Sequence, residues 1–367
     1  MDWRLQKIWN MYRHKGLKCT YNYLWYQVLF AHQGRLARFL WKTCHPLFVH
    51  HPRLVEIEVT TCCPLRCVIC EHTYWNEKAR HMNFEQFKSI IDQFPKLKWV
   101  GLTGIGESFV NPDFMKMLEY VKQKNIYVEL YDPFIFIDEE KAREIVRLGI
   151  DKIFISLDAA TKETYEKVRP GSNFDKVIEN IRRFLEIRKQ ANTPFPDISY
   201  HYIINKLNLR EVLPYADLVK SLTGTESAII FTRMLHSFLE AEEYFTEIPD
   251  SLTDEVRAKA EETGIRIGWN ADAPTKKPPI CDCSFWIMPF IFVTGDVIPC
   301  CAGNEANKRD FQKKYSLGNV FEQDFKDIWN SDKYKRLRDM IHKGQTPIQC
   351  RDCPPFDVAK KKCGKES

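Results

Sequence analysis

The sequence predicts an α/β protein, a partial TIM-like (β/α)6 barrel followed by a small cysteine-rich domain. Six apolar stretches of strand length recur along the first two thirds of the chain. Segments with helical periodicity separate them, and the clearest runs over 174–190, where apolar residues return every three or four positions. The last third instead concentrates cysteines, since seven of the 13 lie at or beyond position 281.

The strands are expected at 55–60, 97–103, 125–131, 152–158, 197–204 and 226–232. Strands that alternate with helices form a parallel sheet, and six such units leave a barrel open on one side. We expect that side to admit a substrate or to be closed by another domain. The predicted domain boundaries are an N-terminal basic and aromatic extension over 1–54, the barrel over 55–232, a bridging segment over 233–280 and the cysteine-rich domain over 281–367. The bridging segment is expected to contain a helix at 251–263 and a short strand at 264–269.

Three cysteines follow the first strand. Three residues separate Cys63 from Cys67, and two separate Cys67 from Cys70. A [4Fe–4S] cluster normally takes four thiolates, so a loop that supplies three leaves one iron open to another ligand. Zinc ribbons instead pair two Cys-x-x-Cys elements, and no second pair lies nearby. Cys62 is the fourth cysteine of this run and is not assigned as a ligand, because its use in place of Cys63 would lengthen the first gap to four residues.

Two further strands end in polar groups. Residues 98–103 lead into the turn Gly104-Ile105-Gly106-Glu107, with Asn111 as the expected N-cap of the next helix. Glycine lets a ligand approach the backbone, and the carboxylate can bind an ammonium group. The strand at 152–158 ends in Ser156 and Asp158, which share one face at a spacing of two. In parallel barrels this end of the strands carries the chemistry.

Over about residues 55–232 these motifs make the chain resemble the radical SAM superfamily. The resemblance implies that Cys63, Cys67 and Cys70 hold a [4Fe–4S] cluster. It also implies that the open iron chelates the amino and carboxylate groups of S-adenosylmethionine.

The resemblance further assigns the residues that bind this cofactor. The Gly104, Gly106 and Glu107 turn would hold the methionine amine. Ser156 and Asp158 would contact the carboxylate or the ribose, and Arg169 would pair with the carboxylate.

Two positions depart from the family pattern. Ile69 precedes the third cysteine, where the family usually has an aromatic residue, and the third strand ends in Tyr131-Asp132-Pro133, where the family often has Asn-Gly. We expect the second departure to alter the floor of the site.

The C-terminal cysteines suit a closed site. Cys283 and Cys300 flank a turn at Gly295, and Cys350 and Cys353 form a Cys-x-x-Cys pair. Four thiolates leave no open iron, but zinc would accept the same four ligands equally well.

Over about residues 281–356 the segment resembles the SPASM or shorter twitch domain. This resemblance implies one auxiliary [4Fe–4S] cluster on Cys283, Cys300, Cys350 and Cys353, with Cys281 and Cys301 as substitutes for an assigned ligand. The full SPASM pattern has further cysteines downstream, and here only Cys363 remains.

The two resemblances together imply an enzyme that reductively cleaves S-adenosylmethionine to a 5′-deoxyadenosyl radical and abstracts a substrate hydrogen. The auxiliary cluster would aid net oxidation or bond formation, and a low-potential donor of the ferredoxin or flavodoxin type would supply electrons. The 54 residues before the first strand are short for a peptide-recognition domain, so a non-peptide substrate such as a small molecule, sugar or lipid is favoured. The alternatives are a peptide-modifying maturase of the SPASM class and a non-catalytic iron–sulfur or zinc protein.

The composition predicts the cellular compartment and the partners of the N-terminal segment. Thirteen cysteines without a signal peptide predict metal use in a reducing, cytoplasmic compartment, and no stretch of 18 apolar residues exists. The first 54 residues hold nine Lys and Arg against one acidic residue, Asp2, with aromatic residues interleaved. Such a segment can pack on the barrel or make peripheral membrane contact; nucleic acid is not expected as a partner.

Overall fold

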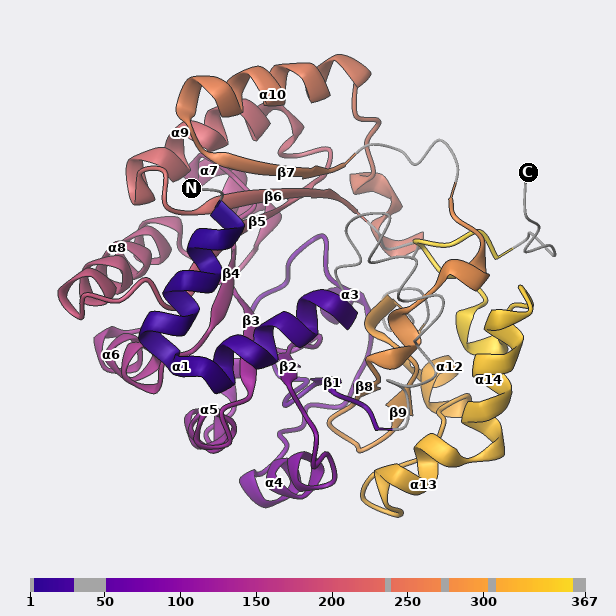
Figure 1. Cartoon of the computed structure of the whole chain (residues 1–367). Helices are drawn as coiled ribbons and strands as arrows, with labels where there is room; N and C mark the ends of the chain where they lie inside the picture. Colours follow the sequence, from indigo (N-terminus) through magenta and orange to yellow (C-terminus); the bar gives the residue numbers. More distant parts are fainter. Residues whose placement is uncertain (1–2, 30–50, 235–238, 272–276, 303–307, 359–367) are drawn as a thin grey trace.

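The computed structural model describes residues 3–29, 51–234, 239–271, 277–302 and 308–358. Within them the centre of the fold is a nine-stranded sheet in the order β7–β6–β5–β4–β3–β2–β1–β8–β9 (Figure 1). Neighbouring strands from β7 to β8 are parallel, and only β9 runs antiparallel to β8. The strands are β1 Leu54–Ile57, β2 Trp99–Leu102, β3 Tyr127–Asp132, β4 Lys152–Ser156, β5 Asp197–Ile204, β6 Ala228–Arg233, β7 Arg266–Asn270, β8 Phe290–Ile291 and β9 Val297–Ile298.

Helices lie along the outside of the curved sheet (Figure 1). The helix predicted over 174–190 is present as α8, and its apolar face buries Val177, Ile181 and Phe184. The predicted α/β class and the largely parallel barrel sheet are therefore confirmed. The barrel helices are α4 Phe84–Asp92, α5 Phe114–Gln123, α6 Glu139–Leu148, α7 Lys162–Val168, α8 Phe174–Gln190, α9 Val212–Thr223 and α10 Asp250–Thr263, with 3₁₀ turns at Ser108–Val110, Leu209–Glu211 and Leu239–Tyr244.

The barrel sheet extends one strand beyond the six that were predicted. β7 pairs with β6 from Ala228↔Arg266 onward, and α10 connects the two strands as a further βα unit. The segment predicted as a bridge thus contributes to the sheet itself. The domain boundaries at 54, 232 and 280 stay a prediction.

The C-terminal part continues the sheet on the side that was predicted to be open. β8 pairs with β1 through Glu56↔Phe290 and Ile57↔Ile291, and the β8–β9 hairpin leads into the last helices. These elements are α12 Arg309–Lys314, α13 Phe325–Asn330 and α14 Asp332–His342, with 3₁₀ turns at Ile280–Asp282, Phe285–Ile287 and Ile348–Cys350.

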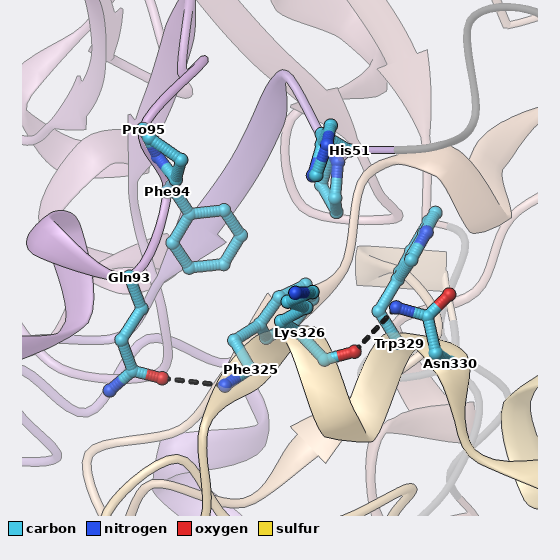
Figure 2. Close-up of a pocket in the computed structure, with 9 residues that line it drawn as sticks. His51, Gln93, Phe94, Pro95, Phe325, Lys326, Trp329 and Asn330 are labelled. Atoms are coloured by element: carbon cyan, nitrogen blue, oxygen red, sulfur yellow. Dashed lines mark hydrogen bonds between the residues drawn. The ribbon is translucent and has the colours of Figure 1, made fainter.

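Side chains next to α4 hold the C-terminal part of the chain against the barrel (Figure 2). Gln93 Oε1 accepts from Phe325 N over 2.7 Å, and Gln93 Nε2 donates to Val320 O over 3.1 Å. The rings of Phe94 and Phe325 lie 4.3 Å apart. The hollow between these residues holds only about 20 Å³, so it is a packed contact and not a substrate cavity.

The helix after the glycine turn begins later than predicted. α5 starts at Phe114, so the expectation that Asn111 caps it is wrong. Asn111 is buried, and its Nδ2 donates to Val59 O and Met82 O, each over 2.8 Å. Those buried carbonyls need a donor, which is why the side chain points inward.

The N-terminal extension predicted over 1–54 is described for residues 3–29 and 51–54; residues 30–50 lie outside the described part, as does Cys363. Residues 3–29 form α1 (Trp3–Leu29), which is kinked at Gly16, where φ is 77° and ψ is 178°. Among the described residues, no helix has both the length and the apolar character needed to cross a bilayer.

Candidate active site

The cysteine loop leaves the C-terminal end of β1 and carries α3 (Glu71–Tyr74). Backbone bonds hold it against the segment after α7: Arg66 N donates to Pro170 O over 2.9 Å, and Val68 N donates to Val168 O over 3.0 Å. Leu65, Val68 and Val168 pack together with Cys67 in a small apolar cluster separate from the main core. The loop is thereby fixed at the end of the barrel where parallel strands deliver functional groups.

The three predicted ligands, Cys63, Cys67 and Cys70, lie within electrostatic reach of one another. Burial raises the pKa of Cys63 to about 11, and the neighbouring Cys67 thiol adds to the effect. Burial likewise raises the pKa of Cys67, and it raises that of Cys70 well above the ordinary thiol value. Cys67 is buried and the other two thiols are partly buried, and thiols that resist ionisation become thiolates when they bind a cationic centre.

Cysteine thiolates are the ligands that iron–sulfur clusters normally take from proteins. A cubane cluster places each thiolate on a different iron, so its ligands need not meet at one point. The donor set therefore fits the [4Fe–4S] group that the loop was predicted to hold, although the ligand assignment itself stays a prediction.

The glycine turn packs directly on the strand and loop beside it. A Cβ on Gly104 would lie 2.5 Å from Glu58 Cγ, and one on Gly106 would lie 2.3 Å from Thr60 O. Glu107 N donates to Cys62 O over 2.8 Å, which ties the turn to the cysteine loop. The two glycines are thus required by close approach of the backbone.

Two carboxyl groups meet beside this turn. Glu107 is buried, and its Oε1 accepts from Phe109 N over 3.0 Å. Asp132, at the end of β3, is also buried, and its Oδ1 accepts from Phe134 N over 2.6 Å. Burial raises the pKa of Glu107, and burial together with the charge of Glu107 raises that of Asp132 well above its ordinary range. One cation would relieve this repulsion, and the sequence had marked Asp132 only as a departure from the family pattern.

Asp158 and Arg169 form a buried ion pair just past the end of β4. Asp158 Oδ2 accepts from Arg169 Nε over 2.7 Å and also contacts Nη2, while Oδ1 accepts from Ile203 N over 2.7 Å. Arg169 Nη1 donates to Cys67 Sγ over 3.7 Å. Both oxygens of Asp158 are engaged, so the carboxylate orients Arg169 beside the cysteine loop. Ser156 ends β4 half-buried, in register with His201.

Sequence reasoning missed a buried pair that connects this site to the C-terminal part. Glu58 Oε2 accepts from Arg309 Nη2 over 2.7 Å and from Ile105 N over 3.2 Å, and Oε1 accepts from Val293 N over 3.4 Å. The guanidinium lies 3.9 Å from the ring centre of Phe292. Glu58 thus joins the glycine turn, the β8–β9 hairpin and α12.

The four predicted auxiliary ligands lie around a second aromatic core. Burial raises the pKa of Cys283 to about 12 and that of Cys353 to about 11, and it raises the pKa of Cys350 too. Cys283 and Cys353 both raise the pKa of Cys350 further. Cys300 and Cys350 both lie close to Tyr334. Cys283, Cys300 and Cys350 are buried and Cys353 is partly buried, and thiols in such surroundings suit thiolate ligation to a cationic centre.

The aromatic core fixes the backbone near these thiols. Trp286 Nε1 donates to Cys283 O over 3.1 Å, and the Tyr334 hydroxyl donates to Trp286 O over 3.2 Å. Trp329 packs against Tyr334, with ring centres 4.6 Å apart.

Two family models match the regions that contain these sites. The model described as the radical SAM superfamily matches residues 57–213, and the SPASM model, an iron–sulfur cluster-binding domain, matches residues 281–354. The chain belongs to the radical SAM superfamily, with a C-terminal SPASM domain. It is a radical SAM enzyme that uses a [4Fe–4S] cluster with S-adenosylmethionine. Because the SPASM domain binds iron–sulfur clusters, the C-terminal cysteines hold auxiliary iron–sulfur rather than zinc. The alternative of a non-catalytic protein is thereby wrong.

Curated relatives of this radical SAM protein have diverse names. The tungsten-containing aldehyde ferredoxin oxidoreductase cofactor-modifying protein of Pyrococcus furiosus is 26% identical over 309 residues, which cover 80% of this chain and 85% of the relative. The AdoMet-dependent heme synthase of Methanosarcina barkeri is 24% identical over 75% of this chain and 81% of its own. The PqqA peptide cyclase of Gluconobacter oxydans is 23% identical over 79% of each chain.

Solved structures share the fold. Streptococcus suis SuiB bound to S-adenosylmethionine superposes with a TM-score of 0.64 at 15% identity, covering 83% of this chain and 72% of that one. The structure of anSMEcpe with bound AdoMet gives a TM-score of 0.59 at 17% identity, covering 86% and 88%.

Proposed function

We propose that this enzyme cleaves S-adenosylmethionine reductively at Cys63, Cys67 and Cys70 and uses the resulting 5′-deoxyadenosyl radical to take a hydrogen from a non-peptide substrate. One observation carries the proposal. The cysteine loop, the Gly104–Glu107 turn and the Asp158–Arg169 pair meet at the C-terminal end of neighbouring parallel strands. The cluster and its cofactor supply the radical chemistry when bound, whereas the protein positions and shields them.

The chain's own residues provide charge complementarity for an amino acid moiety. Glu107 and Asp132 offer a buried pair of carboxyl groups to an ammonium group. Arg169, oriented by Asp158, offers a guanidinium to a carboxylate. Ser156, at the end of β4, is assigned to the carboxylate or the ribose.

The auxiliary site supports a second redox step. We propose one auxiliary [4Fe–4S] cluster on Cys283, Cys300, Cys350 and Cys353, which aids net oxidation or bond formation on the substrate radical. Cluster potential depends on hydrogen bonding and burial around the sulfurs, and the aromatic core of Trp286 and Tyr334 supplies burial here. A low-potential donor of the ferredoxin or flavodoxin type is the proposed electron source.

The proposed substrate class rests on the relatives. Two relatives are named for a modified cofactor and for heme synthesis, which agrees with a small, non-peptide substrate. A peptide is the second candidate, because the PqqA peptide cyclase is also similar over most of the chain.

Anaerobic reconstitution tests the proposal. Reduced enzyme with S-adenosylmethionine should give 5′-deoxyadenosine. A true substrate should raise the yield of 5′-deoxyadenosine, and a deuterated form of that substrate should transfer deuterium into the 5′-deoxyadenosine. Small-molecule cofactor precursors and candidate peptides are compared in parallel. Formation of S-adenosylhomocysteine in step with product would instead indicate methyl transfer.

A further inference from the structure

Helix α1 lies across the barrel (Figure 1). It contacts the segments where β3, β4 and β5 begin, whereas the cysteine loop follows the end of β1. The inner face of α1 is fixed to the starts of the strands: Lys15 Nζ lies 2.5 Å from Asp151 Oδ1, and Lys7 Nζ lies 2.7 Å from Asp197 Oδ2. Asn22 Nδ2 donates to Asn125 O over 2.8 Å, beside β3. These contacts fix α1 on the barrel and leave it with a defined outer face.

That outer face is apolar and aromatic. Each half of the kinked helix presents a stripe at spacings of four and three residues, so each stripe follows one side of the helix. The six side chains, which we call the α1 stripe, make up half of the twelve large hydrophobic side chains exposed among the described residues. They are Leu5, Trp9 and Tyr12, then Leu17, Tyr21 and Leu24, with exposed fractions from 40% to 73%.

A hollow of about 500 Å³ borders the first half of the stripe. It is lined by Leu5, Ile8, Trp9 and Tyr12, together with the buried Thr20 from the second half of the helix. Concentrated apolar exposure of this kind marks an interaction surface, whereas single exposed side chains are ordinary.

The charged side chains of α1 itself are all basic. Residues 3–29 contain no Asp or Glu, and Arg4, Arg13 and Lys18 are exposed on the helix. A second copy of the same surface would therefore meet like charge. Nucleic acid would be complementary in charge but would not cover exposed leucines. Aromatic and leucine side chains flanked by Lys and Arg are the pattern of a helix that lies in the interface of an anionic bilayer.

We propose that the α1 stripe docks this protein on an anionic lipid surface. The apolar side chains would enter the headgroup region, while Arg4, Arg13 and Lys18 contact lipid phosphates. Because α1 covers the starts of β3–β5, the cysteine loop at the strand ends faces away from the bilayer, toward the aqueous phase. This inference does not depend on the proposed substrate or on the auxiliary cluster.

Vesicle flotation of the full-length protein tests it. Binding is expected to vesicles with about 30% phosphatidylglycerol and not to pure phosphatidylcholine, and it should weaken between about 0.1 M and about 0.5 M salt. Trp9→Ala with Leu17→Ala should reduce partitioning by about tenfold or more, since two exposed apolar groups are lost. The matched control, Leu207→Ala with Phe245→Ala, removes two exposed apolar groups elsewhere and should bind like wild type.

Charge reversal separates lipid binding from other occupants. Arg13→Glu with Lys18→Glu should abolish flotation, whereas Lys335→Glu with Arg336→Glu on α14 should not, although both pairs are exposed. All variants should retain 5′-deoxyadenosine formation without vesicles, which shows that they fold. The proposal is overturned if wild type does not float with anionic vesicles at low salt, if the α1 and control variants behave alike, or if light scattering shows a dimer that the Trp9 and Leu17 changes dissociate.

Discussion

Removing the charge of Glu58 should loosen the connection between the glycine turn and the SPASM domain. Glu58 is 1% exposed and Arg309 is 4% exposed, so both charges are shielded from water. The carboxylate accepts from Arg309, Ile105 and Val293, on three different segments. Glu58→Gln keeps one acceptor oxygen of the same size but leaves the guanidinium without its anionic partner.

The expected cost is about 3 kcal/mol of unfolding free energy. Breaking a buried ion pair by changing one partner costs about 3–5 kcal/mol, because the other charge stays buried and unpaired. The lower end applies here, since Glu77 lies 4.0 Å from Arg309 Nε and offers partial compensation. That compensation is limited because Glu77 also pairs with Lys313 at 2.7 Å.

Urea unfolding of the reconstituted protein, followed by circular dichroism, measures the cost. The Glu58→Gln midpoint should fall clearly, while the matched control Glu163→Gln, an exposed carboxylate, should stay close to wild type. S-adenosylmethionine binding should also weaken, because Ile105 N in the glycine turn loses its charged acceptor. Glu58→Met combined with Arg309→Met should recover much of the loss by removing both charges. Equal midpoints for Glu58→Gln and Glu163→Gln would refute the reasoning.

Three further changes test the site and its support. Gly106→Ala should abolish S-adenosylmethionine binding, because the added Cβ would lie 2.3 Å from Thr60 O. Isothermal titration calorimetry should therefore show no heat of binding. Retained affinity would show that the turn can move to accommodate the added methyl group. Asp158→Asn should raise the KM for S-adenosylmethionine more than it lowers kcat, since it frees Arg169 to reorient; a pure kcat loss would contradict a positioning role. Burial raises the pKa of Glu129 to about 7 from 4.5, so the stability its proton provides is complete below pH 4.5 and is lost as pH rises through about 7. Glu129→Gln should therefore gain about 3 kcal/mol relative to wild type between pH 4.5 and pH 8 in urea titrations, and a constant difference would exclude the shift.

The sequence was most informative where function and local pattern coincide. The apolar spacing of 174–190 marks α8, and the strand-length stretches mark β1–β6, because burial against a parallel sheet imposes those periods. The cysteine loop and the glycine turn were predicted from their residue types, and the bond from Glu107 N to Cys62 O shows that the two segments lie side by side.

The remainder depends on contacts between distant segments. Glu58 and Arg309 are 251 positions apart, and no local spacing links them. β8 contains only two residues, Phe290–Ile291, too few to show a strand period before pairing with β1 is known. Asp132 gains its significance only because β3 places it beside Glu107.

The most direct test of the account compares two cysteine variants after anaerobic reconstitution with iron and sulfide. Wild type should hold about eight irons, as two cubane clusters require, and should form 5′-deoxyadenosine when reduced with S-adenosylmethionine. Cys67→Ala should lose this cleavage completely, whereas Cys353→Ala should keep some cleavage and lose substrate turnover. Undiminished 5′-deoxyadenosine from Cys67→Ala would contradict the assignment of the cofactor-cleaving cluster to the loop after β1.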